Sequence, residues 1–379
     1  MVKFVLLLLL TGLPLTMAAA EQMTVEQLES ALKPARHMSD KNLANQLRTV
    51  ELTERLSSTR LAGLRAGLPG EKSRLALIPV SDLSGFLDLP AADIPSTPAL
   101  DRGAQRALLA KSRDYVESAI SRLPDFIATE DTIHFVDTPP KASHFHGKGQ
   151  TGLQMTDRLE SSVHIVQGKE VKDAAAKGEK PEPAGKRLVA AGVFGSILSA
   201  VFEDVLRADL EWGHWEQAVS GPIAVFRYAV APEKSHYIVQ VPGDPGALRT
   251  VTGYRGELSM DPATGAILRL TVKADLWLTG PVSRADILVE YGPVEIGGKI
   301  YICPLHSVAI SVSRPFNLLE DVYGVTQGSA AQSRMQLNDT AFEHYHVFRS
   351  EARIVPEGEA EQPRNGPGAA PAPQATPSP

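Results

Sequence analysis

The chain has 379 residues and a formal charge of -6, with 38 lysines and arginines against 44 aspartates and glutamates. This acidic balance argues against a nucleic-acid partner and leaves no basic stripe for an anionic lipid surface. Because Cys303 is the single cysteine, an intrachain disulfide is excluded, and the length is enough for one sizeable core with a helical accessory region.

Residues 1–20 have the pattern of a secretory signal peptide. Lys3 precedes an apolar run, and small residues lead up to Ala20. The run is shorter than the ~20 apolar residues of a spanning helix, and Pro14 interrupts it. We expect cleavage near Ala20, export to the periplasm or the extracellular space, and no transmembrane span in the mature chain.

Residues 21–122 have the pattern of a helical region. Thr24, followed three residues later by Gln27, predicts a capping box at its start. Apolar residues that recur at helical spacing are Leu28, Leu32, Leu43, Leu47, Leu52, Leu56, Leu61 and Leu64.

Glycine and proline divide this region. The sequence GLPG at residues 67–70 should end one helix, and another should run from about Glu71 into the 80s. A proline-rich connector at residues 89–98 then precedes a helix that begins at Asp101 and reaches about Arg122. We interpret the helical region as a packing or partner-binding arm.

From residue 123 to 353 the pattern changes to alternation of apolar and polar side chains. It is clearest in residues 254–261, 268–278 and 307–313. Such alternation is typical of antiparallel strands with one face on a core and the other in water. We therefore predict an α+β protein, with a helical N-terminal region followed by a large curved antiparallel sheet, of the half-barrel kind, and packing helices.

Three further segments differ from the predicted sheet. Residues 168–187 are charged and contain proline, which predicts a mobile insertion. The apolar residues 188–209 predict a helix or a helix pair. Residues 354–379 are rich in proline and alanine without hydrophobic periodicity, which predicts a disordered tail.

The stretch VEYGPVEIGGKIYICP, residues 289–304, predicts a hairpin and not an active site. Gly297 and Gly298 stand between apolar positions, as in a two-residue turn that needs positive φ at both residues. Pro293 and Pro304 predict a bulge or sharp bend, near a sheet edge. We assign every residue of this stretch a structural role.

Two histidine pairs are the strongest candidates for chemistry. They are His144 with His146, and His344 with His346. In an extended segment the imidazoles of a pair share one face, as many metal sites require. The second pair also shares the face of the neighbouring phenylalanines and should point to the apolar side. Surface or satisfied histidines give the same pattern, and neither spacing is a specific metal signature.

Other signatures of catalysis are absent from the sequence, which has no G-x-S-x-G, H-E-x-x-H or P-loop. Asp261 and Asp275 are explained by a turn and by a solvated strand face. Cys303, in an apolar strand, predicts a buried and inert thiol, with an intermolecular disulfide or a nucleophile as alternatives. We assign no catalytic, cofactor-binding or metal-binding residue and expect no cofactor, which favours a non-catalytic protein over an enzyme.

Four aromatic residues fall on two predicted neighbouring strands, Trp212 and Trp215 on one and Phe226 and Tyr228 on the next. In a curved sheet such side chains can line a hydrophobic concavity. Ordinary core packing is the interpretation that we favour.

The stretches YRGELSMDPATGAILRL and ADILVEYGPVEIGGKIYICPLHSVAIS resemble a family of uncharacterised bacterial exported proteins of the cell envelope. LTERLSSTRLAGLRAGLPGEKSRLAL and LPDFIATEDT are similar to the same family, so that the resemblance covers most of the mature chain. This family implies no catalytic residue. More remotely, the D-P-x-T-G turn between two strands resembles the periplasmic lipoprotein carriers and stress-sensor domains, whose half-barrels accept acyl chains.

Two classes of function remain open from the sequence. One is a non-catalytic cell-envelope module that binds an apolar ligand, a lipid or a lipoprotein acyl chain, in a pocket under a helix around residues 189–205. The other is a scaffold that binds an envelope protein and fills its sheet with its own side chains. A metal-dependent enzyme that uses the paired histidines is a third hypothesis.

Overall fold

The computed structural model describes residues 21–33, 38–137, 152–166, 169–172, 196–205, 209–218, 221–241, 243–244, 248–277, 282–313, 316–317 and 333–348. Residues 1–348 form one compact unit, to which all of these belong, and residues 349–379 form another. The expected signal peptide at 1–20, the expected tail at 354–379, and the pair His144 and His146 lie outside the described residues.

The helices of the N-terminal region begin and end close to the predicted positions. They are α1 Val25–Leu32, α2 Asp40–Leu47, α3 Ser58–Gly67, α4 Glu71–Ser84 and α5 Arg102–Arg122, with a 3-10 turn at Ala91–Asp93. Thr24 and Gln27 form the expected capping box. The break at 67–70 separates α3 from α4, and Asp101 caps α5 through the backbone N–H of Ala104.

One part of the predicted helical pattern is wrong. Leu52 ends a short strand, β2 Val50–Leu52, which pairs in parallel with β1 Glu21–Met23, and Leu56 lies between β2 and α3. Both leucines are buried in the core of the helical region. Their four-residue spacing therefore reflects burial in a common cluster and not a shared helix.

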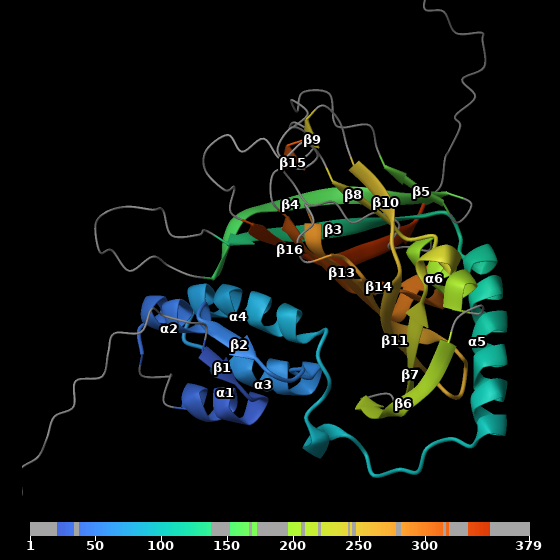
Figure 1. Cartoon of the computed structure of the whole chain (residues 1–379), viewed down its shortest axis with the longest axis horizontal. Coiled ribbons are helices and arrows are strands. Elements are labelled where there is room, and N and C mark those ends of the chain that lie inside the picture. Colours follow the sequence, from blue (N-terminus) through green and yellow to red (C-terminus); the bar gives the residue numbers. More distant parts are fainter. Residues whose placement is uncertain are drawn as a thin grey trace, which may run out of the picture. The chain divides into compact units, whose positions relative to one another are not determined.

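Among the described residues, ten antiparallel strands form one open sheet, which confirms the α+β class (Figure 1). In order across the sheet they are β5 Lys169–Lys172, β4 Leu153–Val166, β3 Phe126–Asp137, β16 Arg334–Val347, β14 Lys299–Ser313, β13 Val282–Ile296, β12 Ile267–Ala274, β11 Tyr254–Met260, β7 Gly221–Val230 and β6 Asp209–Ala218. β5 lies inside the segment that the sequence predicts to be a mobile insertion. Two small pairs of strands are not hydrogen-bonded to this sheet. They are β8 Ile238–Val241 with β10 Leu248–Val251, and β9 Gly243–Asp244 with β15 Phe316–Asn317.

The two faces of the sheet are covered by different helices. On one face α5 and α6 (Ser196–Val205) pack onto the main core, where Phe126, Phe226 and Leu258 are fully buried. On the other face the end of α4 and the following Phe86 pack against Ile133 and Leu288. The sequence from Arg55 to Asp93 therefore lies over the second face.

Because the helical region covers the second face of the sheet, the expectation that this face lies in water is wrong. The polar positions of β12 and β14 should face water, yet Arg269, Thr271 and Ser307 are buried. A bulge near Met260 also moves Leu268 out of the predicted alternation, and Ile267 takes the place in the main core. The sequence pattern of these strands indicates half-burial because their second face is polar. The helical region nevertheless covers that face and removes it from water.

The hairpin in residues 289–304 forms as predicted. Gly297 and Gly298 have φ of 60° and 79°, and Ile296 pairs with Lys299 across the turn. The register shifts between Glu290 and Tyr291, which is the bulge expected near the prolines.

A glycine in β11 tests the packing of the sheet. Gly256 pairs with Tyr228, whose hydroxyl donates across it to the carbonyl oxygen of Thr271. An alanine Cβ at 256 would collide with that carbonyl oxygen and with the Tyr228 hydroxyl. We expect Gly256→Ala to lower the free energy of unfolding by about 2 kcal/mol or more in urea titrations.

The matched control is Gly63→Ala in α3. A Cβ at that position meets nothing within 4 Å. Alanine there should raise the free energy of unfolding by about 0.5–1 kcal/mol. Equal effects of the two substitutions would contradict the close approach at Gly256.

Candidate functional site

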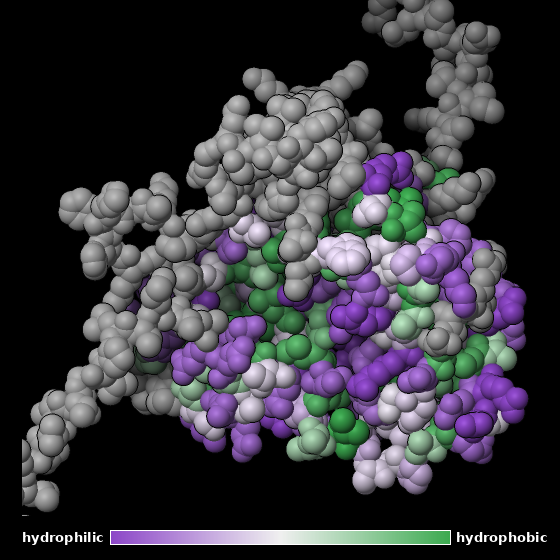
Figure 2. Space-filling model, viewed as in Figure 1, coloured by the Kyte–Doolittle hydropathy of each residue, from purple (hydrophilic) through white to green (hydrophobic). Residues whose placement is uncertain are grey.

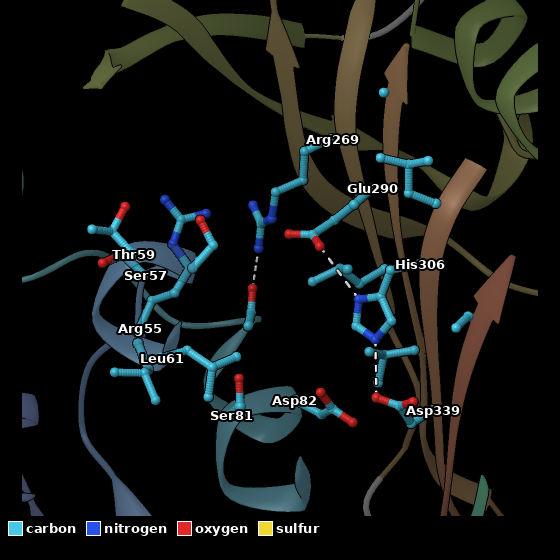
Figure 3. Close-up of a pocket in the computed structure, with 18 of the residues that line it drawn as sticks. Arg55, Ser57, Thr59, Leu61, Ser81, Asp82, Arg269, Glu290, His306 and Asp339 are labelled. Atoms are coloured by element: carbon cyan, nitrogen blue, oxygen red, sulfur yellow. Dashed lines mark hydrogen bonds and ion pairs between the residues drawn. The ribbon is translucent and has the colours of Figure 1, made fainter. Parts of the chain in front are cut away.

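A pocket of about 1160 Å³ lies between the segment from Arg55 to Asp93 and the second face of the sheet (Figure 3). Its floor is formed by strands from β4 across to β6, and its cover by α3, α4 and the residues that flank them. The size is that of a small-molecule site. The residues at its floor decide what such a site can hold.

Charged side chains of three neighbouring strands stand directly opposite one another on this floor. Arg269 of β12 pairs with Glu290 of β13, and Glu290 pairs with His306 of β14. Side chains at directly opposed positions of a sheet lie on the same face and interact. The strand register therefore produces a row of alternating charge that no single segment of sequence contains.

Three residues from separate elements meet at one end of this row (Figure 3). His306 Nδ1 is 3.3 Å from Glu290 Oε2, and its Nε2 is 3.0 Å from Asp339 Oδ2, on β16. Asp82, in the last turn of α4, points toward them, and possible ligand atoms of Asp82, His306 and Asp339 all lie within 4.8 Å of one another. Asp82 is 5% exposed, and its Oδ2 has no hydrogen-bond partner among the described residues.

The charges of this cluster determine its protonation. Burial, together with the negative charge of Asp339, raises the pKa of Asp82 well above its usual value. Burial opposes a charge on His306, but hydrogen bonds with Asp339 and Glu290 outweigh it and raise the pKa of His306 well above its usual value. Burial likewise opposes ionisation of Glu290, whereas His306 lowers the pKa of Glu290. Asp82 and His306 thus retain protons that solvated groups would lose, whereas Glu290 is ionised.

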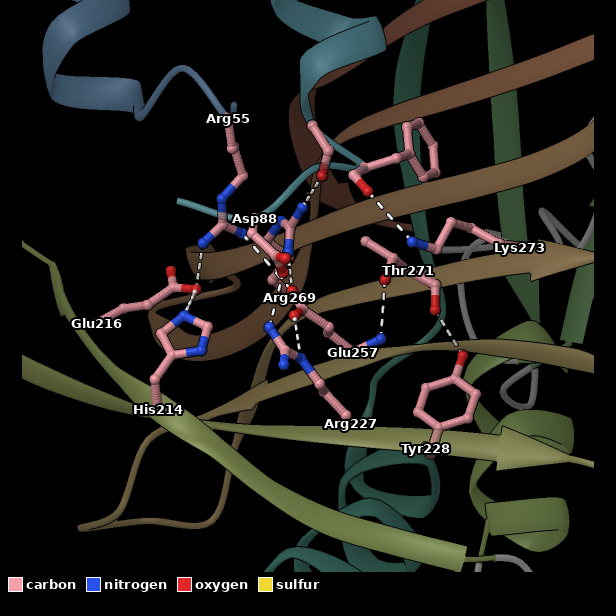
Figure 4. Close-up of polar contacts among 12 residues, drawn as sticks. Arg55, Asp88, His214, Glu216, Arg227, Tyr228, Glu257, Arg269, Thr271 and Lys273 are labelled. Atoms are coloured by element: carbon pink, nitrogen blue, oxygen red, sulfur yellow. Dashed lines mark hydrogen bonds and ion pairs between the residues drawn. The ribbon is translucent and has the colours of Figure 1, made fainter. Parts of the chain in front are cut away.

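A second polar cluster joins the cover to the floor (Figure 4). Arg55 forms an ion pair with Glu216, and His214 Nε2 is 3.1 Å from the same carboxylate. Arg269 donates to the carbonyl oxygen of Gly85, just after α4, and lies 3.5 Å from Glu257. These contacts hold Arg55, at the start of the cover, and the end of α4 against β6, β11 and β12.

Burial and neighbouring charges shift the pKa values of Arg269 and Glu216 in this cluster. Burial and the nearby charge of Arg55 lower the pKa of Arg269 to about 10. Burial also opposes ionisation of Glu216, but the hydrogen bond with His214 and the charges of Arg55 and Arg269 overcome it and lower the pKa of Glu216 to about 2. Glu216 is therefore an ionised partner over the whole physiological range.

Aliphatic side chains that the fold leaves partly exposed form another part of the pocket lining. Those of the cover are Leu61, Ile78 and Leu89, and those of the sheet are Ile223, Leu268 and Leu305. Figure 2 shows hydrophobic surface between the helical region and the sheet, with hydrophilic residues around it. The pocket thus combines aliphatic and charged side chains on both its cover and its floor.

The candidate histidines of the sequence do not lie in this pocket. His344 and His346 are exposed, and a bulge between Glu343 and His346, with φ of 53° at His344, breaks the alternation. Their predicted orientation toward the apolar side is therefore wrong, since Phe342 is buried while both imidazoles face out. His144 and His146 lie outside the described residues.

Other residues singled out in the sequence have structural surroundings. Cys303 is buried in the main core, and burial raises the pKa of its thiol to about 12, as expected of an inert thiol. Trp215, Phe226 and Tyr228 belong to the same core, with Trp212 packed against it, which confirms ordinary packing. Asp261 accepts from the backbone N–H of Ala263 in its turn.

The cluster around His306 was not predicted from the sequence. Its members, Asp82, Glu290, His306 and Asp339, come from α4, β13, β14 and β16 and have no fixed spacing in the sequence. A signal for one pair exists in the hairpin. Counting outward from Gly297 and Gly298 pairs Tyr291 with Pro304 and would pair Glu290 with Leu305. The bulge expected near the prolines moves the register by one residue and brings His306 opposite Glu290. Asp82 and Asp339 offer no comparable signal.

Comparisons with known proteins give no relative. No family model, no curated protein and no solved structure matches the chain. None of the described helices combines the length and apolar composition needed to cross a bilayer.

The ionised state of Glu216 predicts a pH dependence of stability. Because its pKa is lowered from 4.5 to about 2, its stabilisation is present above pH 4.5 and is lost as the pH falls toward 2. We expect this loss to be about 3 kcal/mol in urea unfolding of the wild type. Glu216→Gln should be less stable at pH 7 and should lack this part of the acid dependence.

Glu211→Gln is the matched control, since Glu211 is exposed on the same strand. Its unfolding should follow the wild type at every pH. If the free energy of unfolding of Glu216→Gln falls as steeply between pH 4.5 and 2 as that of the wild type, the proposed role of the ion pair is contradicted.

Proposed function

We propose that the protein is an exported binding module that holds an amphipathic small molecule between its helical region and its sheet. The observation that carries the proposal is the pocket of about 1160 Å³, which is lined by both partly exposed aliphatic side chains and charged side chains. The apolar part of the ligand would contact residues such as Leu61, Leu268 and Leu305. Its polar part would lie over Glu290 and His306.

Several features support this proposal. Aliphatic side chains from separate strands and helices line one cavity, where an apolar ligand would remove them from water at a gain of about 25 cal/mol per Å². Glu290 keeps 45% of its side-chain surface accessible although His306 lies against it, so a ligand group can reach it. The signal-like N-terminal sequence supports an envelope location, where lipids and their fragments are available.

This pocket differs in place from the apolar pocket expected under a helix at residues 189–205. In the described part of that segment, Val201, Phe202 and Val205 of α6 pack into the main core. Residues 189–195 lie outside the described residues. The filled core beneath α6 favours the second candidate function, a scaffold that binds an envelope protein.

Native mass spectrometry of the protein purified from its native cells tests the proposal. We expect an added mass in the range of a lipid or an acylated small molecule, which organic extraction removes. Leu305→Glu places a charge on the aliphatic wall at a residue that is 41% exposed, so the fold should tolerate it. The bound fraction should fall at least about fivefold, because a buried carboxylate opposes an apolar group.

Ile300→Glu is the matched control on the same strand, since Ile300 is 73% exposed and does not line the pocket. It should keep the wild-type bound fraction. If the wild-type protein carries no added mass, the binding-module proposal is wrong and the scaffold becomes the favoured function. Equal bound fractions in the two variants would place the ligand elsewhere on the protein.

A further inference from the structure

We propose that Asp82, His306 and Asp339 bind a divalent transition-metal ion such as Zn²⁺ through one imidazole nitrogen and two carboxylate oxygens. The three side chains come from α4, β14 and β16 and meet on the pocket side of the sheet. The inference does not depend on the proposed amphipathic ligand. It stands on the geometry, burial and charge of the cluster itself.

The geometry of His306 is that of a metal-binding imidazole. Its Nδ1 faces the carboxylate of Glu290 at 3.3 Å, and its Nε2 faces Asp339 at 3.0 Å. Ligating histidines commonly donate the N–H of one nitrogen to a carboxylate while the other nitrogen binds the ion. Glu290 would therefore orient the imidazole, and Nε2 would be the ligand atom.

The distances allow a common ion after a small movement. In a tetrahedral site two ligands about 2.1 Å from the ion lie about 3.4 Å apart. Nε2 of His306 and Oδ2 of Asp339 are 3.0 Å apart, close to that separation. Candidate ligand atoms of all three residues lie within 4.8 Å of one another, so Asp82 needs to approach by at most about 1.5 Å.

Asp82 supplies the independent reason to expect a cation. It is 5% exposed, its Oδ2 has no hydrogen-bond partner among the described residues, and it points at Asp339 (Figure 3). It also stands in the last turn of α4, where the partial charge of the helix is negative. One oxygen of this buried carboxyl group thus lacks the partner that such atoms require, and a metal ion would provide it.

The donor set indicates the class of metal. One imidazole and two carboxylates suit Zn²⁺ or Mn²⁺ better than the all-oxygen sites of Ca²⁺ and Mg²⁺. Three protein ligands would leave at least one position of the ion for water or for a molecule in the pocket. The cluster therefore resembles an open site more than a closed structural one.

Isothermal titration calorimetry, in which ZnCl₂ is added to the chelator-treated full chain and the heat of binding is measured, tests the inference. We expect one saturable site per chain, and at least about tenfold weaker binding in His306→Gln and Asp339→Asn. Glu343→Gln removes a carboxylate that lines the same pocket outside the cluster, and it should bind as the wild type does. Circular dichroism of each variant reports whether it is folded.

Asp82→Asn separates metal binding from folding. The amide keeps the size of the side chain but is a poor metal ligand, so the metal-free variant should melt close to the metal-free wild type and should bind Zn²⁺ at least about tenfold more weakly. This variant carries the test if His306→Gln or Asp339→Asn does not fold. Binding of wild-type strength in Asp82→Asn would overturn the proposal.

The exposed histidines provide a second control. The double variant His344→Gln, His346→Gln should keep the affinity of the wild type, because both imidazoles lie on the surface away from the pocket lining. Loss of the site in that variant, or the absence of saturable Zn²⁺ binding by the wild type, would overturn the assignment to Asp82, His306 and Asp339.

Discussion

The burial of charge beneath the segment from Arg55 to Asp93 is the constraint on which the pocket depends. A charged side chain that leaves water must find partners, and Arg269 finds them in the carbonyl oxygen of Gly85 and in Glu257. Arg55 finds Glu216 in the same way. Since the contacts of Arg269 with Gly85 and of Arg55 with Glu216 each join the cover to a strand, the two parts hold a fixed spacing that leaves room between them.

Local features of the fold were predictable because each depends on a few adjacent residues. Thr24 and Gln27 satisfy backbone groups within one turn of α1, and Gly297 and Gly298 adopt a φ that other residues avoid. The polar face of β12 was misread for the opposite reason. Nothing near Arg269 in the sequence shows that residues more than 180 positions earlier will cover it.

The candidate site shows the same limit more strongly. The pair Glu290 and His306 follows from the hairpin register together with its bulge, so the sequence contains it in principle. Asp82 and Asp339 join that pair only through the packing of α4 on the sheet and the position of β16 beside β14. The histidine pairs, which attract attention by their spacing, include two residues that a bulge turns outward. Proximity in sequence therefore accounts for one pair of the site and not for the other two residues.

The place of β16 in the sheet has a consequence for how the chain folds. β16 lies between β3 and β14, so it joins the strands made first to those made later. Until residues 334–347 are available, β3 and β14 both present open edges, which are prone to pairing with other chains. Asp339 arrives with this same strand. The cluster around His306 is therefore completed only when β16 joins β3 to β14, so a chain in which β16 has not yet paired would lack the complete cluster.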